Sequence, residues 1–283
     1  MMPQYHVKYV FLFLCCSLLL SSCVNIKHVT EFSKSAIDSI ETFETLSSSF
    51  NQTCLEDCQN INIAALNIHQ TDCDCSQNEE ADRITALIYH GLQGYFYALT
   101  NISDNQLTNY QTDGLTNAIT SGNFGSIQVK EANVKSYSNI ITLVGRAFTD
   151  GYRRNKIKTY VLNANQPVQD LLHFLDLNLT GNLKGKLEVQ KSTLKNYYFD
   201  LVRDKKLSTY ERTKFAEDYF KRMQEIERQQ NELEAYSKIL STIAEGHASL
   251  SAEIEHLNDN KLKVALAKYG SQLKMLSTDL FKK

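Results

Sequence analysis

Two rows of apolar residues, each repeating every seven positions, dominate the C-terminal third of the chain. One row is Tyr219, Ile226, Leu233 and Leu240, and its companion is Tyr236, Ile243, Leu250 and Leu257. Residues seven apart lie on one side of an α-helix, so two adjacent rows form a seam that faces another helix. The pattern predicts one long heptad-patterned helix over residues 208–258. Ser208 is its expected N-cap, because Glu211 follows three positions later and completes a capping box.

Gly246 is the expected place for a bend or break in this helix, because glycine costs about 1 kcal/mol relative to alanine inside a helix. Apolar residues at three- and four-residue steps predict further helices elsewhere in the chain. Their expected ranges are 27–48, 79–99, 127–148, 167–179, 183–207 and 262–280.

Particular residues set the limits of these helices. Ile127, Val134, Ile141 and Phe148 step by seven and place the third helix, while at most one short helix is expected within 101–125, at 114–120. Pro167 is expected to open the fourth helix and Thr180-Gly181 to end it. Short connections between long helices imply antiparallel packing. We therefore predict an all-α fold: an antiparallel helical bundle with long coiled-coil-like helices and a disulfide-stapled excursion.

The N-terminus has the parts of a secretory signal peptide. Lys8 precedes an apolar run of 12 residues, Tyr9–Leu20, and small residues follow. A run of this length is too short to span a bilayer, which takes about 20 residues.

Leu20-Ser21-Ser22-Cys23 resembles the lipobox of bacterial lipoproteins. The resemblance covers only the first 23 residues. It implies that residues 1–22 are a lipoprotein signal peptide, that residues 23–283 are the mature helical domain, and that Cys23 carries the lipid that holds the protein in the cell envelope. Val24 stands where an Asp would favour the inner membrane, so the same resemblance favours the outer membrane. The alternative is an ordinary cleaved signal with a chance cysteine nearby.

Four cysteines remain in the mature chain besides Cys23: Cys54, Cys58, Cys73 and Cys75. An even number in an exported protein indicates two disulfides. Closure of Cys73 with Cys75 would be strained, so we favour bridges between the two pairs, and a nested pairing would close a small hairpin. The order of the bridges stays open. A zinc site is the alternative, but Cys73-Asp74-Cys75 is tighter than the usual ligand spacing.

No motif of a phosphate loop, serine hydrolase or zinc protease is present in the sequence. Asp170 with His173, and Glu253 with His256, each place a carboxylate and a histidine three positions apart on an expected helix. Di-iron bundles use this spacing with further glutamates. These four residues are weak metal-ligand candidates, and we expect no bound metal or cofactor.

Aromatic residues cluster around two glycines in the second expected helix. Tyr89, His90, Tyr95 and Tyr97 are candidates for a ligand site there. The alternative, which we favour, is that these residues fill the core where helices approach closely.

The charge and the missing catalytic motifs narrow the function. Residues 1–22 contain one basic and no acidic side chain, so the mature chain has 29 basic and 32 acidic side chains, a net charge of −3. Nucleic-acid binding would require a basic excess. We predict a non-enzymatic, lipid-anchored envelope protein that binds or scaffolds a protein partner. The alternatives are a small-molecule or metal-binding bundle, including an enzyme, and an immunity or inhibitor lipoprotein.

Overall fold

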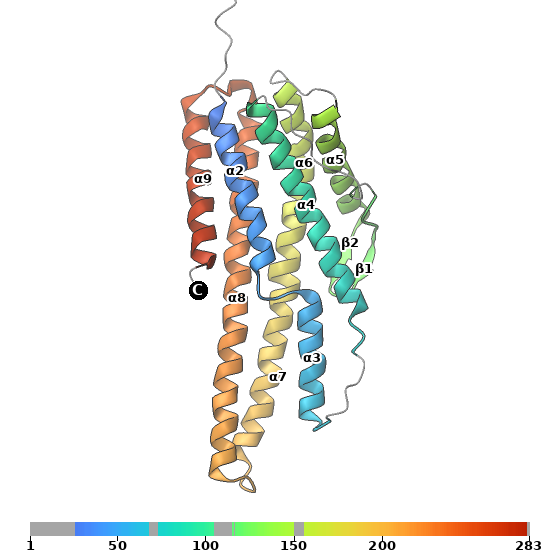
Figure 1. Ribbon diagram of the computed structural model, residues 1–283, viewed down its shortest axis with the longest axis vertical. Helices are drawn as coiled ribbons and strands as arrows, with labels where there is room; N and C mark the ends of the chain where they lie inside the picture. The colour runs from blue at the N-terminus through green and yellow to red at the C-terminus, as the bar shows by residue number, and fades with distance from the viewer. Residues whose placement is uncertain (1–25, 68–72, 105–114, 116, 150–155, 282–283) are drawn as a thin grey trace, which may run out of the picture.

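The computed structural model describes residues 26–67, 73–104, 115, 117–149 and 156–281. The predicted signal peptide, residues 1–22, and Cys23 lie outside these residues. The predicted all-α class is confirmed: 85% of the residues that the structure describes are helical, and the long helices pack antiparallel (Figure 1). The main helices are α2 (Lys27–Glu41), α3 (Phe50–Ala64), α4 (Ser76–Asp104), α5 (Glu131–Thr149), α6 (Ile157–Asp176), α7 (Lys184–Arg203), α8 (Thr209–Ala252) and α9 (Asn260–Phe281).

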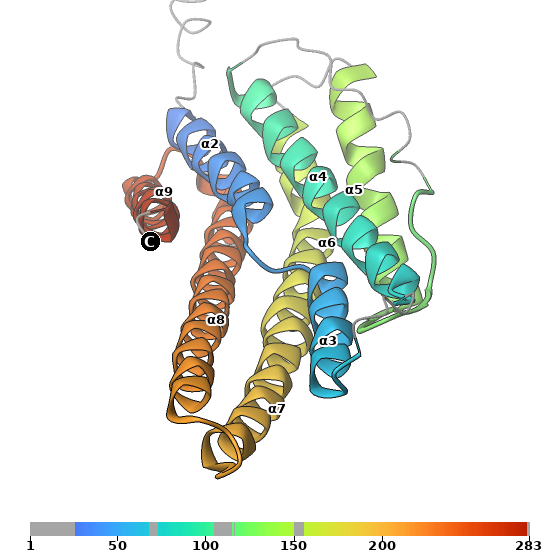
Figure 2. The same cartoon turned by 60° about the horizontal axis from the view of Figure 1, so that its bottom comes forward.

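Two parts of the molecule differ in how many helices they contain (Figures 1 and 2). The proximal bundle consists of α2, α4, α5, α6, α9 and residues 231–252 of α8. The distal hairpin consists of α7, the turn at residues 204–208 and residues 209–230 of α8, with α3 lying beside α7. In both views the distal hairpin extends beyond the other long helices.

The core of the proximal bundle is rich in buried aromatic side chains. Its largest fully buried side chains include Phe32, Tyr95, Phe96, Tyr137, Tyr160 and Tyr236. Aromatic side chains bury a large apolar area and pack edge-to-face or offset-stacked. Phe32 meets Phe96 edge-on, with ring centroids 6.1 Å apart, and Tyr95 stacks on Tyr160 at 5.2 Å.

Helix α8 begins as the sequence predicts, with Ser208 and Glu211 in a capping box, but it continues unbroken through Gly246. A Cβ atom at Gly246 would lie 2.3 Å from Cε2 of Phe32, so the glycine admits the α2 ring rather than breaking the helix. The helix ends at Ala252, six residues short of its predicted end at 258. A short turn, η4 (Ile254–His256), follows, and the Asp259 side chain accepts the Lys261 N–H at the start of α9.

The predicted helix boundaries around Pro167 are wrong. Helix α6 has Pro167 in its interior and continues through a π-helical turn, η3 (Leu177–Leu183), into α7, giving a continuous rod of 47 residues over 157–203. Thr180-Gly181 lies within the π-helical turn rather than ending a helix. The Asn178 side-chain amide donates to the Phe174 carbonyl, so the widened turn keeps this backbone group bonded.

The predicted helix over 127–148 begins late, because Ile127 belongs to a β-hairpin. Strands β1 (Gly122–Phe124) and β2 (Ile127–Val129) pair antiparallel, and Gly125 takes a positive φ of 55° in the turn between them. Residues 117–120, within the predicted short helix, are not helical. Helix α5 starts only at Glu131.

The stapled segment is more regular than predicted. Residues 50–64 form α3, and the Ser49 hydroxyl caps this helix by accepting the Gln52 N–H. The disulfides are nested, Cys54–Cys75 and Cys58–Cys73, with Cα–Cα distances of 5.9 and 6.1 Å. They join α3 to the residues that lead into α4, and no cysteine among the four remains as a thiolate for a zinc site.

Candidate functional site

The predicted ligand cluster in α4 does not form one pocket. Tyr89 and Tyr95 are buried, whereas His90 is exposed and Tyr97 is half-buried. Tyr89 stacks on Phe43 with ring centroids 3.8 Å apart. The only pocket among those described that Tyr89 and His90 share has a volume of about 50 Å³. Ligand pockets usually measure about 300–1,000 Å³, so core packing accounts for these residues better than a ligand site does.

A buried histidine that the sequence analysis missed lies at the centre of the proximal core. His247 is fully buried, its Nε2 lies 2.7 Å from the Tyr95 hydroxyl, and its Nδ1 lies 3.2 Å from Asn165 Oδ1. The amide oxygen only accepts, so Nδ1 carries the proton and Nε2 accepts from Tyr95. Burial lowers the pKa of His247 to about 3, so the ring is neutral at physiological pH. The heptad row of α8 could have revealed it, since His247 follows Leu240 by seven.

The four metal-ligand candidates are not brought together. Asp170 accepts hydrogen bonds from Ser136 at 2.8 Å and Gln166 at 2.7 Å, and His173 is exposed. Glu253 pairs with Lys261 at 3.5 Å, and His256 is exposed. Within the part of the chain that the structure describes, no three His, Cys, Asp or Glu side chains are placed to hold a metal ion.

The two candidate histidines also lie at different levels of the bundle. Lys158, at the start of α6, forms an ion pair with Glu255 in η4, next to His256. His173 lies 15 residues farther along α6, about 22 Å away at 1.5 Å per residue. A two-metal centre holds its ions only about 4 Å apart, so these histidines cannot share one.

Helix α3 contacts the distal hairpin mainly through polar groups. Arg222 donates to Asn60 Oδ1 at 2.8 Å, and Gln190 donates to Glu56 at 3.5 Å. Only Phe50 and Thr53 of α3 are fully buried. At its C-terminal end the helix exposes Ile61 and Ile63 instead of packing them. This interface is therefore more polar than the proximal core.

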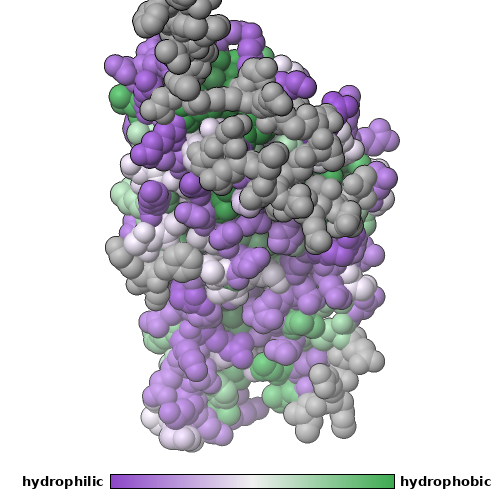
Figure 3. Space-filling model, turned by 45° about the horizontal axis from the view of Figure 1, so that its top comes forward, coloured by the Kyte–Doolittle hydropathy of each residue, from purple (hydrophilic) through white to green (hydrophobic). Residues whose placement is uncertain are grey.

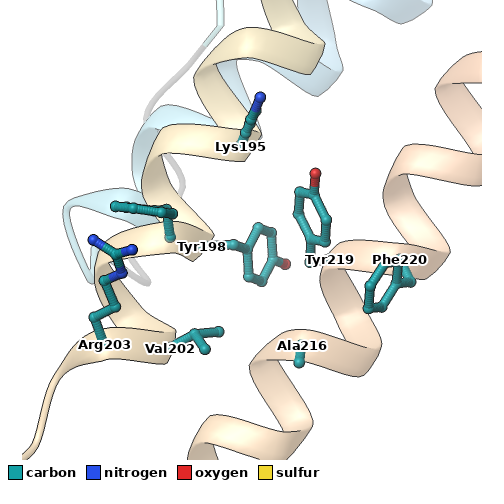
Figure 4. Close-up of a pocket in the computed structure, with 8 residues that line it drawn as sticks. Lys195, Tyr198, Val202, Arg203, Ala216, Tyr219 and Phe220 are labelled. Atoms are coloured by element: carbon teal, nitrogen blue, oxygen red, sulfur yellow. The ribbon is translucent and has the colours of Figure 1, made fainter.

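The largest described pocket lies between α7 and α8 in the distal hairpin, and we call it the tip pocket (Figure 4). Its volume is about 370 Å³. Tyr198 and Tyr219 lie between the two helices with ring centroids 6.0 Å apart. The pocket is lined by Lys195, Tyr198, Phe199, Val202, Arg203, Ala216, Tyr219 and Phe220.

Large apolar side chains of the tip pocket face solvent. Phe199 is 50% exposed and Phe220 is 62% exposed. The Arg203 guanidinium lies 3.7 Å above the Phe199 ring, a cation–π contact that leaves the cation at the edge of the pocket. Burial raises the pKa of Tyr198, so its hydroxyl stays neutral. The pocket combines aromatic walls with two cations, and its lining residues include no carboxylate and no histidine.

The region around the tip pocket has a net charge of opposite sign to that of the rest of the chain. Residues 195–222 contain eight basic and five acidic side chains, a net charge of +3. The other residues contain 22 basic and 27 acidic side chains, a net charge of −5. The apolar periodicity of the sequence predicts this region as parts of two helices. The adjacent aromatics Tyr197-Tyr198-Phe199 and Tyr219-Phe220 were the available signal.

The next largest of the described pockets measures about 260 Å³ and is lined by apolar residues such as Phe43, Leu46 and Leu179. On the face shown in Figure 3, which brings the proximal end forward, hydrophilic residues predominate and hydrophobic residues form small separate patches. Searched over its described residues, the structure has no helix long and apolar enough to cross a bilayer.

Comparison with known proteins gives no match: no family model fits the sequence, and no curated protein or solved structure is significantly similar to the chain.

Proposed function

We propose that this chain is a non-enzymatic lipoprotein of the bacterial envelope, anchored through Cys23, that binds a protein partner through its distal hairpin. The observation that carries the proposal is the position of the tip pocket. The turn between α7 and α8 lies at the opposite end of the molecule from the N-terminus of α2, the first described helix (Figure 1). The exposed aromatic residues Phe199 and Phe220 belong to the two helices that this turn connects.

The length of α8 separates the two ends. His28, at the start of α2, has a hydrogen-bonding contact with the backbone of Leu257, just beyond the C-terminus of α8. Tyr219 of the tip pocket precedes Ala252 by 33 residues, about 50 Å of helix. Cys23 is three residues before Ile26, so a fully extended chain keeps it within about 11 Å of that residue. A lipid on Cys23 would hold the proximal end at the membrane and the tip pocket away from it.

Two further observations support export and a non-enzymatic role. Disulfides persist in oxidising compartments such as the bacterial periplasm and the cell surface, and this chain has two. The most perturbed histidine, His247, has no exposed surface and therefore has no access to a substrate.

The shape of the distal hairpin favours a protein partner over a second bilayer. The turn contains the charged, exposed residues Asp204, Lys205 and Lys206. Phe220 lies on the flank, 11 residues after Thr209 and therefore about 16 Å from the start of α8. A flat membrane that met the turn would not reach Phe220, whereas a protein segment lying along the hairpin would.

Fractionation and crosslinking test this function together. The wild-type protein should be found in the membrane fraction, and a Cys23→Ser variant should be soluble after signal cleavage. Membrane attachment that survives Cys23→Ser would contradict the anchor.

A photoreactive residue at position 220 should give one dominant protein adduct in cells, and the repeated absence of any adduct would contradict the binding role.

A further inference from the structure

We propose that the tip pocket receives an acidic amphipathic helix of the partner, with an apolar side chain in the pocket and carboxylates beside Lys195 and Arg203. This inference rests on the proposed function and adds the chemistry of the partner. It is carried by the spacing of the pocket residues, by the absence of a covering helix among the described residues, and by the position of the two cations.

The pocket residues line a groove parallel to the helices. Those from α7 are at positions 195, 198, 199, 202 and 203, and those from α8 are at 216, 219 and 220. These steps of three and four place each set along one face of its helix. A groove between two helices accepts a third helix, which buries its own residues at three- and four-residue steps.

The neighbouring parts of the fold already have such a third helix. The proximal part of α8 packs against α2, α6 and α9. Farther along, α3 covers the side of the hairpin that carries Gln190 and Arg222, and α3 ends at Ala64. The tip pocket is lined by residues of α7 and α8 alone, so in the described structure nothing covers its aromatic walls.

The two cations of the pocket set the expected spacing of the partner's carboxylates. Lys195 and Arg203 are eight residues apart on α7, about 12 Å along the helix, and both are exposed. The α8 side contributes the uncharged residues Ala216, Tyr219 and Phe220. An apolar anchor flanked by acidic residues three or four positions away on each side would place carboxylates near both cations.

Charge disfavours one other occupant, and the shape of the hairpin disfavours another. A second copy of this chain would bring two regions of net charge +3 together, and like charges across an interface are costly. An anionic bilayer would suit the cations but would meet the charged turn before Phe220. We therefore assign the pocket to a protein segment.

A library of random peptides displayed on phage provides the probe, with the mature full-length Cys23→Ser chain as bait. Selected peptides should share an apolar residue with Asp or Glu three or four positions to either side. The best peptide should bind a Lys195→Glu/Arg203→Glu variant at least tenfold more weakly. Replacing its acidic residues with Lys should restore binding to that variant.

A matched control has the same charge change outside the pocket. Lys205→Glu/Lys206→Glu should weaken peptide binding by less than about threefold, because both lysines lie in the turn. Phe220→Ser should abolish binding without shifting the thermal midpoint, which separates a lost contact from a lost fold.

Three results would overturn the inference: selected peptides without an acidic pattern, equal affinity for the Lys195→Glu/Arg203→Glu variant, or cosedimentation of the bait with phosphatidylglycerol–phosphatidylethanolamine vesicles that depends on Phe220. The outcomes also separate the two proposals. If position 220 gives an adduct in cells but the selected peptides show no preference for acidic residues, the proposed function stands. The proposal that the partner segment is an acidic helix is then rejected.

Discussion

The proximal bundle and the distal hairpin share the helix α8 but differ in what surrounds it. In the proximal bundle Leu233 and Leu240 are 0% and 1% exposed, because α8 is enclosed by other helices. In the distal hairpin the same heptad row continues to Tyr219, which is half-buried and lines an open pocket. A heptad pattern therefore identifies a surface that packs against helices, but it does not say whether those helices belong to the same chain.

The two parts also use polar residues differently. In the proximal bundle His247 is enclosed between Tyr95 and Asn165 with both ring nitrogens hydrogen-bonded. In the distal hairpin Arg222 bonds to Asn60 across a solvent-accessible seam. The first arrangement specifies one rigid core, while the second is open to exchange with solvent and with a partner. Stability should therefore be concentrated in the proximal bundle and binding in the distal hairpin.

Truncation of a core residue should have the largest effect. Leu240→Ala removes a fully buried side chain and leaves a cavity, so it should lower the free energy of unfolding by about 2–5 kcal/mol. Urea unfolding followed by circular dichroism measures the change. A loss below about 1 kcal/mol would show that the proximal core is looser than its burial indicates.

Loss of one disulfide should affect α3 selectively. The Cys58–Cys73 bridge closes a separation of 15 residues, for which loop closure contributes about 3 kcal/mol. In a Cys58→Ala/Cys73→Ala variant, amide hydrogen exchange in α3 should accelerate by roughly a hundredfold. Residues 233–250 of α8 provide the internal control and should exchange as in the wild type. Equal acceleration of exchange in both segments would contradict the claim that the disulfide stabilises α3 selectively.

Acid should weaken the proximal bundle before the distal hairpin. Below pH 6.5 the unfolded chain protonates His247, whereas the folded chain keeps it neutral to about pH 3. The contribution of His247 to the free energy of unfolding is therefore fully present above pH 6.5. It is lost as the pH falls toward 3, at up to about 1.4 kcal/mol per pH unit. Burial also lowers the pKa of His28, which adds in the same direction.

Unfolding at pH 7 and pH 5 tests this dependence. The free energy of unfolding of the wild type should fall by about 2 kcal/mol between these two pH values through His247. His247→Gln should be less stable at pH 7 but should show a shallower dependence on pH. Residues 184–230 contain no histidine, so an equally steep pH effect confined to the distal hairpin would contradict the assignment.

Substitution in the tip pocket should have the smallest effect on stability. Phe220→Ser replaces a side chain that is already 62% exposed, so the free energy of unfolding should change by no more than about 0.5 kcal/mol. Thermal unfolding measures it. A loss of 2 kcal/mol or more would mean that Phe220 supports the fold and would weaken its role as a binding residue.

The sequence predicts the fold class because long apolar periodicity leaves few other arrangements. It fails where tertiary packing outweighs local preference. Pro167 and Gly181 carry strong local signals to begin or end a helix, yet buried neighbours such as Leu171, Leu179 and Leu183 hold the rod together. Gly246 is understood only when Phe32, over 200 residues earlier, is placed against it.

The candidate site was less predictable than the fold. The ligand candidates Tyr89 and Tyr95 are aromatic residues of the core. The residue type alone does not show whether an aromatic side chain is buried or exposed. Tyr198 and Tyr219 form the tip pocket only because α7 and α8 are adjacent antiparallel helices. That register depends on the turn at residues 204–208, which a single sequence does not determine.

Site-specific photocrosslinking in intact cells tests the central claim most directly, namely that the distal hairpin is the binding end. The photoreactive residue replaces Phe220 in one variant and Val264 of α9 in another, since both are well exposed, at 62% and 69%. The account predicts one dominant protein adduct from position 220, lost on Lys195→Glu/Arg203→Glu, and no such adduct from position 264. The same dominant adduct from 264 and none from 220 would contradict it.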